Sequence, residues 1–315
     1  MDRYAYVLRR LAQLVPVALG VTFVTFLLVH LLPGDPALAV LGDRATPQLI
    51  AQLHHQWGLD RSLPEQYWLF LQRLAHGNLG DSLLYRVPVR SMIVQRTPVT
   101  LLLLAYSTVL AVLISVPLAL LAARRKDGPA DQAVRAVPIV GLGMPPFWVG
   151  LMLVTLLASG DVFKWFPVGG YGSGFTGHLD SMFLPALTVA IGTAPLLIRS
   201  LRASLLRVLE ADYITTARAK GIPERRVLLR HALRNGLMPM ITVLGINLGF
   251  LIGGTVVVEK VFALPGVGAM IFDGISQRDF AVVQGTTLVL ASLVVFVNVV
   301  IDVTYSLLDP RVRFD

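Results

Sequence analysis

The residue types that usually carry chemistry occur in this sequence without the spacing that chemistry needs. No cysteine is present, which excludes a disulfide scaffold, a thiolate metal site and a cysteine nucleophile. No lysine follows a glycine, so the phosphate-binding pattern G-x-x-x-x-G-K is missing, as is the nucleophile elbow G-x-S-x-G. The six histidines form neither H-E-x-x-H nor another metal-binding spacing; they are His30, His54, His55, His76, His178 and His231. We therefore expect no catalytic residue, no metal and no cofactor in this chain.

One strongly charged segment runs from Arg199 to Arg234 and holds nine Lys and Arg against three Asp and Glu. Within it, Pro223 and Glu224 predict a helix start, because proline needs no N–H there and an acid favours the positive helix end. Arginines recur every four residues and apolar residues occupy the other side: Arg226, Arg230 and Arg234 against Leu228, Ala232, Leu229 and Leu233. A loop that only contacts lipid phosphates would need the charge alone. Two helices hinged at 221–223 favour a protein-docking surface.

The composition indicates which elements hold this segment. Charged residues make up 15% of the 315 residues and hydrophobic residues 55%, and the formal net charge is +8. A soluble domain usually carries about 25% charged residues to cover its surface, so a soluble globule is excluded. Nucleic-acid binding is disfavoured, because its basic patch would need an otherwise polar surface.

Six runs without Asp, Glu, Lys or Arg are long enough to cross a bilayer, which needs about 20 helical residues. They are Leu11–Leu32, Thr97–Ala123, Ala136–Gly160, Ser181–Ile198, Asn235–Val258 and Phe280–Ile301, of which the fourth is the shortest. The first run, with Arg9 and Arg10 before it and Ala-Leu-Ala at 37–39, also has features of a cleaved signal peptide. It is longer than the usual signal core of about 7–15 residues, which favours a retained helix. The sequence thus predicts an all-α integral membrane protein with six transmembrane helices.

Basic residues predict the orientation of these helices. With the N-terminus inside, the inner segments 1–10, 124–135, 199–234 and the C-terminal tail hold 18 of the 27 Lys and Arg. Six of the nine outer ones lie in the long segment 33–96, where they have little influence on topology. Both termini are therefore predicted to be cytoplasmic.

Segment 33–96 is the only sizeable outer segment. Residues 33–36, Pro-Gly-Asp-Pro, predict a turn. Start signals at Thr46 and Ser62, with stop signals at Gly58 and Gly77, predict two short helices. Three aromatic residues on the second helix suit the membrane–water boundary: Tyr67, Trp68 and Phe70. This pattern favours a cap lying on the membrane surface, and direct docking of a soluble partner is the alternative.

Small and polar residues within the runs indicate where helices pack or a pathway runs. Gly245, Gly249 and Gly253 share one face of the fifth run, close to Asn247, which fits packing within the bundle, a subunit interface or a pathway wall. In the sixth helix, Asn298 is a further polar candidate and Asp302 fits packing among helix ends better than proton relay. Ion-driven carriers keep ionisable groups near the midplane, where this chain has none. A solute transporter that takes its energy from a cytoplasmic partner fits these features best.

Several spaced motifs resemble the permeases of peptide/nickel-class ABC importers. The charged segment reads D-Y-I-T-T-A-R-A-K-G over 212–221 and H-A-L-R-N-G-L-M-P over 231–239, similar to the EAA loop of that class. Nearly the whole chain shares the resemblance, through L-L-P-G-D-P at 31–36, E-K-V-F-A-L-P-G-V-G at 259–268, R-D-F at 278–280 and L-D-P-R at 308–311. The chain is most similar to the B-type permeases of dipeptide and oligopeptide systems.

This resemblance implies a type I importer bundle in the bacterial cytoplasmic (inner) membrane. The implied organisation is an N-terminal tail and first helix (1–32), an extracytoplasmic segment (33–96), a permease domain (97–309) with the coupling loop at 199–236, and a tail (310–315). The implied partners are a C-type permease subunit, two ATPase subunits that bind ATP and Mg²⁺, an extracytoplasmic solute-binding protein and membrane lipid, with no nucleic acid. Alternating access would move di- or oligopeptides, and this chain itself would not be an enzyme.

The coupling residues follow from the motif positions. Thr215, Thr216, Ala217 and Gly221 fall on the E-A-A-x-x-x-G positions, where Thr215 replaces the glutamate of the broad consensus. Ala217 and Gly221 are expected to offer a small face to a groove of the ATPase, with Arg218 and Lys220 pairing with acids around it. The expected coupling set is Asp212, Tyr213, Thr215, Thr216, Ala217, Arg218, Lys220, Gly221, Ile222 and Pro223.

Two alternative functions fit the same residues. The same family handles nickel and metal chelates, and His54, His55 and His76 lie in the predicted outer segment. A membrane scaffold without a solute path would show similar apolar runs.

Overall fold

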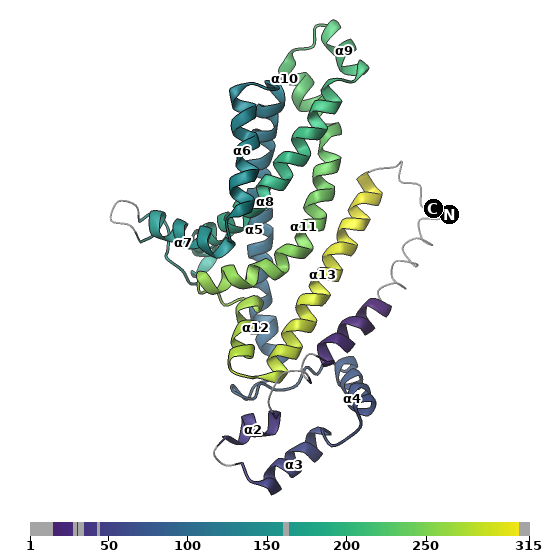
Figure 1. The fold of residues 1–315 in the computed structure, drawn as a ribbon, viewed down its shortest axis with the longest axis vertical. Helices are drawn as coiled ribbons and strands as arrows, with labels where there is room; N and C mark the ends of the chain where they lie inside the picture. The colour runs from purple at the N-terminus through teal and green to yellow at the C-terminus, as the bar shows by residue number, and fades with distance from the viewer. Residues whose placement is uncertain (1–14, 28–29, 31–34, 43–44, 160–163, 309–315) are drawn as a thin grey trace. The chain divides into compact units, whose positions relative to one another are not determined.

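The computed structural model describes residues 15–27, 30, 35–42, 45–159 and 164–308, which fold into helices without a strand (Figure 1). Side chains at 36, 39–40, 137–140, 142 and 302–308 lie outside the described set. The chain divides into two compact units. Unit 1 comprises Met1–Thr100 and Pro265–Asp315, and unit 2 comprises Leu101–Leu264.

Within the described residues, four helices are long and apolar enough to cross a membrane: Val89–Arg124 (α5), Gly174–Leu209 (α8), Glu224–Val261, and Phe280–Ile301 within α13 (Phe280–Leu308). They contain the second, fourth, fifth and sixth predicted runs. The fourth run, the shortest in the sequence, lies in a helix of 36 residues. Of the first predicted run, a helix is described over Val15–Leu27, and the other residues except 30 lie outside the described set.

The third predicted run is wrong as one continuous helix. It divides into α6 (Pro129–Gly143) and α7 (Pro146–Leu157). Between them, Met144 and Pro145 have extended backbone. The consecutive prolines at 145 and 146 explain the break, because proline disfavours helical backbone in the residue before it and donates no N–H.

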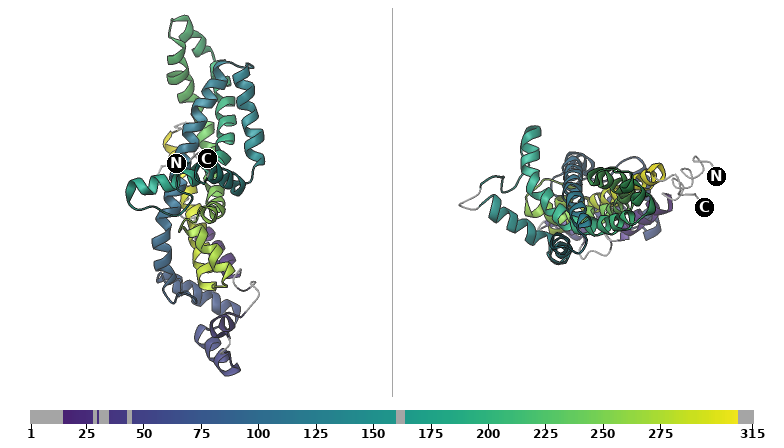
Figure 2. Two further views of the ribbon diagram at one scale, coloured as in Figure 1. Left: turned by 90° about the vertical axis from the view of Figure 1, so that its left-hand side faces the viewer. Right: turned by 90° about the horizontal axis from the view of Figure 1, so that it is seen from above.

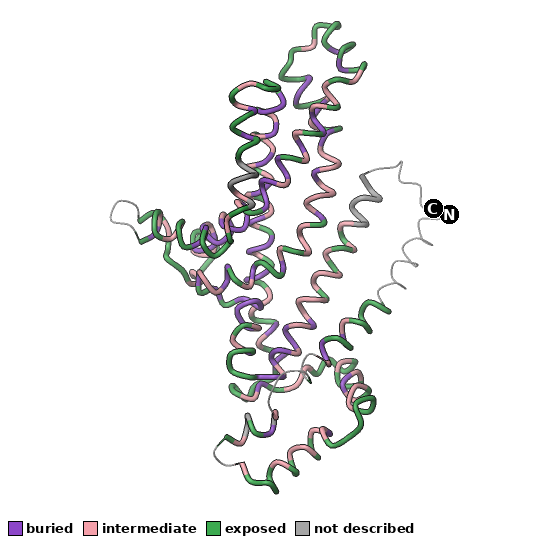
Figure 3. The backbone as a smooth tube through the Cα atoms, in the orientation of Figure 1, coloured by how far each residue is buried: buried purple, intermediate pink, exposed green. Residues whose placement is uncertain are grey.

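Helix α8 is the central element of unit 2. It contacts α6, α7 and α11 (Leu233–Val261) and carries more buried residues than its neighbours, as Figure 3 shows. The core near its C-terminal half is built from small and branched side chains of α5, α8 and the start of α11, including Ala119, Leu201 and Leu205. Close packing there requires Gly236, where an added Cβ would lie 3.0 Å from Leu205 Cδ2. At this end, the backbone of α11 at Gly236 therefore packs directly against the side chain of Leu205 on α8.

Unit 1 joins the start of α5 to α12 (Val267–Ser276) and α13 through a core of Val89, Ile93, Met270 and Val282. Asp279 immediately precedes α13, and its carboxylate accepts hydrogen bonds from Val282 N (3.2 Å) and Ser82 Oγ (2.6 Å). This side chain caps the helix and fixes the preceding loop at once.

Both short helices predicted in segment 33–96 are confirmed. Thr46 caps α3 (Pro47–Trp57), which ends at Gly58 with φ +72°. Ser62 and Glu65 form a capping box on α4 (Leu63–Ala75). Before them, Asp35 caps the short α2 (Pro36–Leu41).

The aromatic side chains of α4 divide between two environments. Tyr67 and Phe70 pack on Phe26 of the first helix, with ring centroids 5.4 and 6.2 Å away, and the Tyr67 hydroxyl lies 2.9 Å from Thr22 Oγ1. Only Trp68 stays largely exposed, at 61%. Two of the three aromatics expected at the membrane boundary thus hold α4 against the first helix.

Candidate functional site

Most residues of the segment 210–224 in unit 2 are exposed, and this segment is called here the α9 loop. It contains α9 (Asp212–Ala219) between the C-terminus of α8 and the start of α10 (Glu224–Arg226). Ile214 and Ala217 are buried, at 0% and 7% exposure, and they fix one face of α9 against the chain. Tyr213, Thr216 and Lys220 are exposed at i, i+3 and i+7, so they share one exposed face, which lies beside the buried one.

The position of Ala217 differs from the prediction. Its small side chain was expected to face a partner, but it packs within this chain. Helical spacing explains the difference, because Ile214 and Ala217 lie three residues apart and share the apolar face of a short helix that must anchor itself. Ile214 has no place in the predicted set, although its isolation among polar neighbours was a signal for an anchor.

Gly221 ends α9 in the left-handed conformation, with φ +74°. The Gly221 N–H donates to the Arg218 carbonyl (2.9 Å), and the Ile222 N–H donates to the Ala217 carbonyl (3.2 Å). These two bonds form a Schellman motif. An added Cβ at Gly221 would meet no atom within 4 Å, so the backbone conformation, and not lack of space, requires glycine here.

An ion pair closes the turn after Gly221. Arg218 donates to both carboxylate oxygens of Glu224, at 2.8 and 3.1 Å. The hydrogen bond to Glu224 raises the pKa of the Arg218 guanidinium. Both side chains are more than 40% exposed, so the pair stabilises the fold by at most about 1 kcal/mol. Its bidentate geometry sets the angle at which the chain leaves α9.

The helix predicted to begin at Pro223–Glu224 does begin there, but it changes type. Residues Val227–Ala232 form a π-helix (η2) between α10 and α11. Val227 and Ala232, five residues apart, are both fully buried, whereas Leu229 is 46% exposed. The prediction that Leu229 lies on the apolar side is therefore wrong, because a π turn uses i, i+5 spacing. The three predicted arginines, Arg226, Arg230 and Arg234, are exposed.

A hydrogen bond ties the exposed face of α9 to α11. Asn235 Nδ2 donates to the Tyr213 hydroxyl at 2.9 Å, across 22 residues of sequence. The α9 loop is thus held at its buried face, at its C-terminal turn and at Tyr213.

Two family models match the chain over most of its length. The description "Binding-protein-dependent transport system inner membrane component" matches residues 115–314, and its N-terminal counterpart matches residues 3–104. The chain belongs to this family. It is therefore a multi-pass permease of the cytoplasmic membrane, and the α9 loop lies within the larger matched region.

Full-length relatives have the same type of name. The permease is 40% identical over 314 residues to a proposed peptide transport system permease protein of Brucella abortus (strain 2308), covering 99% of both chains. It is 37% identical to the oligopeptide transport system permease protein AppB of Bacillus subtilis (strain 168), covering 98% of this chain and 99% of AppB. It is 35% identical to the dipeptide transport system permease protein DppB of Escherichia coli (strain K12), covering 98% of each.

A buried ion pair beneath the α9 loop has no place in the sequence prediction. Arg202, near the end of α8, donates from Nε and Nη2 to both carboxylate oxygens of Asp131 on α6, the second at 2.6 Å. The Asp131 side chain is fully buried, and the hydrogen bond from Arg202 lowers the pKa of its carboxyl group. The two residues lie 71 positions apart, so no local pattern could pair them.

The predicted packing residues of the permease lie in different surroundings. On α11, Gly245 is buried, Gly249 is half-buried and Gly253 is exposed, with no atom within 4 Å of an added Cβ. Asn247 donates to the Val243 carbonyl (2.7 Å) of its own helix. On α13, Asn298 is exposed, and the side chain of Asp302 lies outside the described residues.

Proposed function

We propose that this permease is the B-type subunit of an ATP-driven importer that moves di- or oligopeptides from an extracytoplasmic binding protein across the membrane. The observation that carries the proposal is the α9 loop, an anchored and exposed helix on a chain whose sequence has no phosphate-binding loop. The names of its full-length relatives, which specify peptide, dipeptide and oligopeptide transport, support the solute class.

The proposed topology has six spans with both termini cytoplasmic, in a type I bundle. In it the third span is 136–160, formed by the C-terminal part of α6 and by α7, whereas the start of α6 is cytoplasmic. Segment 33–96 is extracytoplasmic, and 199–236 is the cytoplasmic coupling loop within the permease domain 97–309. The partners are a C-type permease, two ATPase subunits that bind ATP and Mg²⁺, and a solute-binding protein. The excess of Lys and Arg in segments 124–135 and 199–234 supports this orientation.

The packing around α9 suggests how ATP-driven motion reaches the spans. Ile214 anchors α9 in the chain, and the Arg218–Glu224 pair fixes the turn that leads into α10. Because α8 and α11 pack closely at Gly236, a displacement of α9 moves the ends of both helices together. Alternating access then follows from two helices that respond as one body.

Reconstitution tests the proposed function. We expect uptake of a radiolabelled di- or pentapeptide into proteoliposomes to require the binding protein, both permeases, the ATPases and ATP. Uptake of Ni²⁺ without peptide uptake would instead support the metal alternative. Among the described residues, no group of three His, Asp or Glu is placed to hold a metal ion, and His54 and His55 pair separately with Asp35 and Asp60.

A further inference from the structure

The turn between α5 and α6, residues Arg124–Gly128, is a fixed corner beside the α9 loop; it is called here the α5–α6 corner. Figures 1 and 2 show this turn at the same end of unit 2 as the C-terminal end of α8. Asp127 has φ +61°, and its N–H donates to Asp131 Oδ2 at 3.0 Å. The carboxylate of Asp131, in the first turn of α6, therefore accepts a backbone N–H of the turn that precedes the helix.

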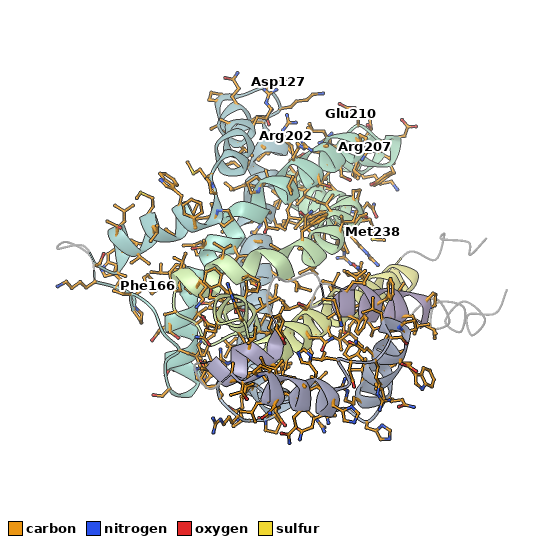
Figure 4. All side chains as sticks on the ribbon, turned by 60° about the horizontal axis from the view of Figure 1, so that its bottom comes forward. Asp127, Phe166, Arg202, Arg207, Glu210 and Met238 are labelled. Atoms are coloured by element: carbon orange, nitrogen blue, oxygen red, sulfur yellow. The ribbon has the colours of Figure 1, made fainter. Side chains whose placement is uncertain are left out.

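Ion pairs hold this corner to α8. Asp131 receives both donors of Arg202, and Lys126 Nζ lies 3.0 Å from Glu210 Oε1 at the end of α8. Figure 4 labels Asp127, Arg202 and Glu210, which come together at this end of the unit. A small apolar layer lies below, formed by Ala122, Val134, Ala194 and Ile198. The corner is thus fixed by ion pairs to α8 and by the apolar contacts of this layer.

The corner also reaches the other end of the α9 loop. The hydrogen bond from Arg218 lowers the pKa of the Glu224 carboxyl group, and the charge of Arg124 on the corner lowers it further. Glu210 and Glu224 are the first and last residues of the loop. The corner is therefore ion-paired with the first residue of the loop, and its positive charge also acts on the last.

Cationic side chains cover this combined surface. Arg124 and Arg125 are exposed on the corner, and Lys220, Arg225 and Arg226 are exposed on and after the α9 loop. Within the described residues, Arg125 forms no ion pair. We propose that the α5–α6 corner and the α9 loop form one composite docking surface, on which Arg125 contacts an acidic patch of the ATPase subunit.

This inference rests on the proposed function and extends its docking site beyond the loop. A contact with lipid phosphates would need positive charge but no fixed position. The fold instead places the corner by a buried bidentate ion pair and a second ion pair to the base of the loop. A rigid partner surface is the occupant that benefits from such placement, because preorganised contacts lose less entropy on binding.

The test measures binding of purified ATPase subunits to the purified permease pair in neutral detergent. We expect Arg125→Glu to weaken binding by at least about fivefold, as for loss of one exposed charge pair, and to reduce its dependence on salt. Arg125→Lys should bind almost normally. Arg73→Glu, the same reversal at an exposed arginine of α4, should leave the affinity unchanged.

Three outcomes decide between the explanations. If the wild-type permease pair binds no ATPase, the proposed function itself fails. If Gly221→Val weakens binding and Arg125→Glu does not, the loop docks alone and the composite surface is wrong. If Arg125→Glu acts only when anionic lipid is added, the corner is a lipid contact and the inference is overturned.

A second measurement does not depend on the stability of the charge variant. Because the chain has no cysteine, Arg125→Cys provides a single reactive thiol. A short bifunctional cross-linker should join this thiol to the ATPase subunit in the assembled complex. Cross-linking at Thr216→Cys without any at Arg125→Cys would contradict the proposal.

Discussion

Asp131 forms a buried ion pair with Arg202 near the C-terminal end of α8. Its side chain is fully buried, and Arg202, with a side chain 18% exposed, provides both hydrogen bonds of a bidentate pair. Removing one partner of such a pair leaves an uncompensated charge in a desolvated place. Loss of either partner is therefore expected to destabilise the packing of α6 on the C-terminal end of α8, which leads into the α9 loop.

We expect Arg202→Met to lower the free energy of unfolding by about 3–5 kcal/mol, the usual cost of breaking a buried ion pair from one side. The double variant Asp131→Asn with Arg202→Met should recover part of this loss, because no charge remains buried. Thermal unfolding in nanodiscs measures both. Equal destabilisation by the single and double variants would show that packing, and not charge, is decisive.

The same pair predicts a pH dependence. The hydrogen bond from Arg202 lowers the pKa of the Asp131 carboxyl group in the folded protein, so its stabilising contribution is complete above about pH 4 and is lost as the pH falls further. The difference in Tm between the wild type and Arg202→Met should therefore be largest near pH 8, should shrink on acidification because the unpaired carboxyl group of the variant takes up a proton, and should be smallest below about pH 4. A difference that grows on acidification would contradict this assignment.

Gly221 allows a sharper test than its motif position suggests. Its φ of +74° imposes about 1–2 kcal/mol of strain on a β-branched residue, whereas the surrounding space is open. We expect Gly221→Val to abolish peptide uptake and Gly221→Asn to retain much of it, because asparagine tolerates the left-handed conformation. Loss of uptake in both variants, with normal insertion, would mean that a partner needs the bare backbone.

Some individual helices could be predicted from local sequence and others could not. The capped helices α3 and α4 were predictable because Thr46, Ser62 and Gly58 act within one turn. The break between α6 and α7 could have been read from Pro145 and Pro146, which membrane helices also tolerate. The π-helix η2 was not predictable, because burial of Val227 and Ala232 against other helices determines it.

The orientation of α9 can be tested with introduced thiols, since the chain has no cysteine. Thr216→Cys should react quickly with a membrane-impermeant maleimide applied to inside-out vesicles, and Ile214→Cys should react slowly because that position is buried. Added ATPase should protect Thr216→Cys. Fast labelling of Ile214→Cys would show that α9 is not anchored by its apolar face.

For the whole molecule, spans and family membership could be predicted from apolar runs and spaced motifs, whereas long-range pairs such as Asp131 with Arg202 could not.

One face of α11 is exposed in the isolated chain. Along α11, Ile246, Phe250, Gly253 and Val257 are all exposed and follow i, i+4, i+7 and i+11 spacing, which places them on one face. Bulky apolar residues around an exposed glycine form a surface that a second helix can approach closely.

We expect this α11 face to contact the second permease subunit. Gly253→Cys, at a position where an added side chain meets no atom of this chain, should form a disulfide or short cross-link with a cysteine on the partner permease. Asn298→Cys, exposed on α13, serves as the comparison thiol in the same membranes. Labelling of Gly253→Cys by a lipid-soluble probe in the assembled complex, without any cross-link, would instead show that lipid covers the face, and the subunit contact would have to lie on another helix.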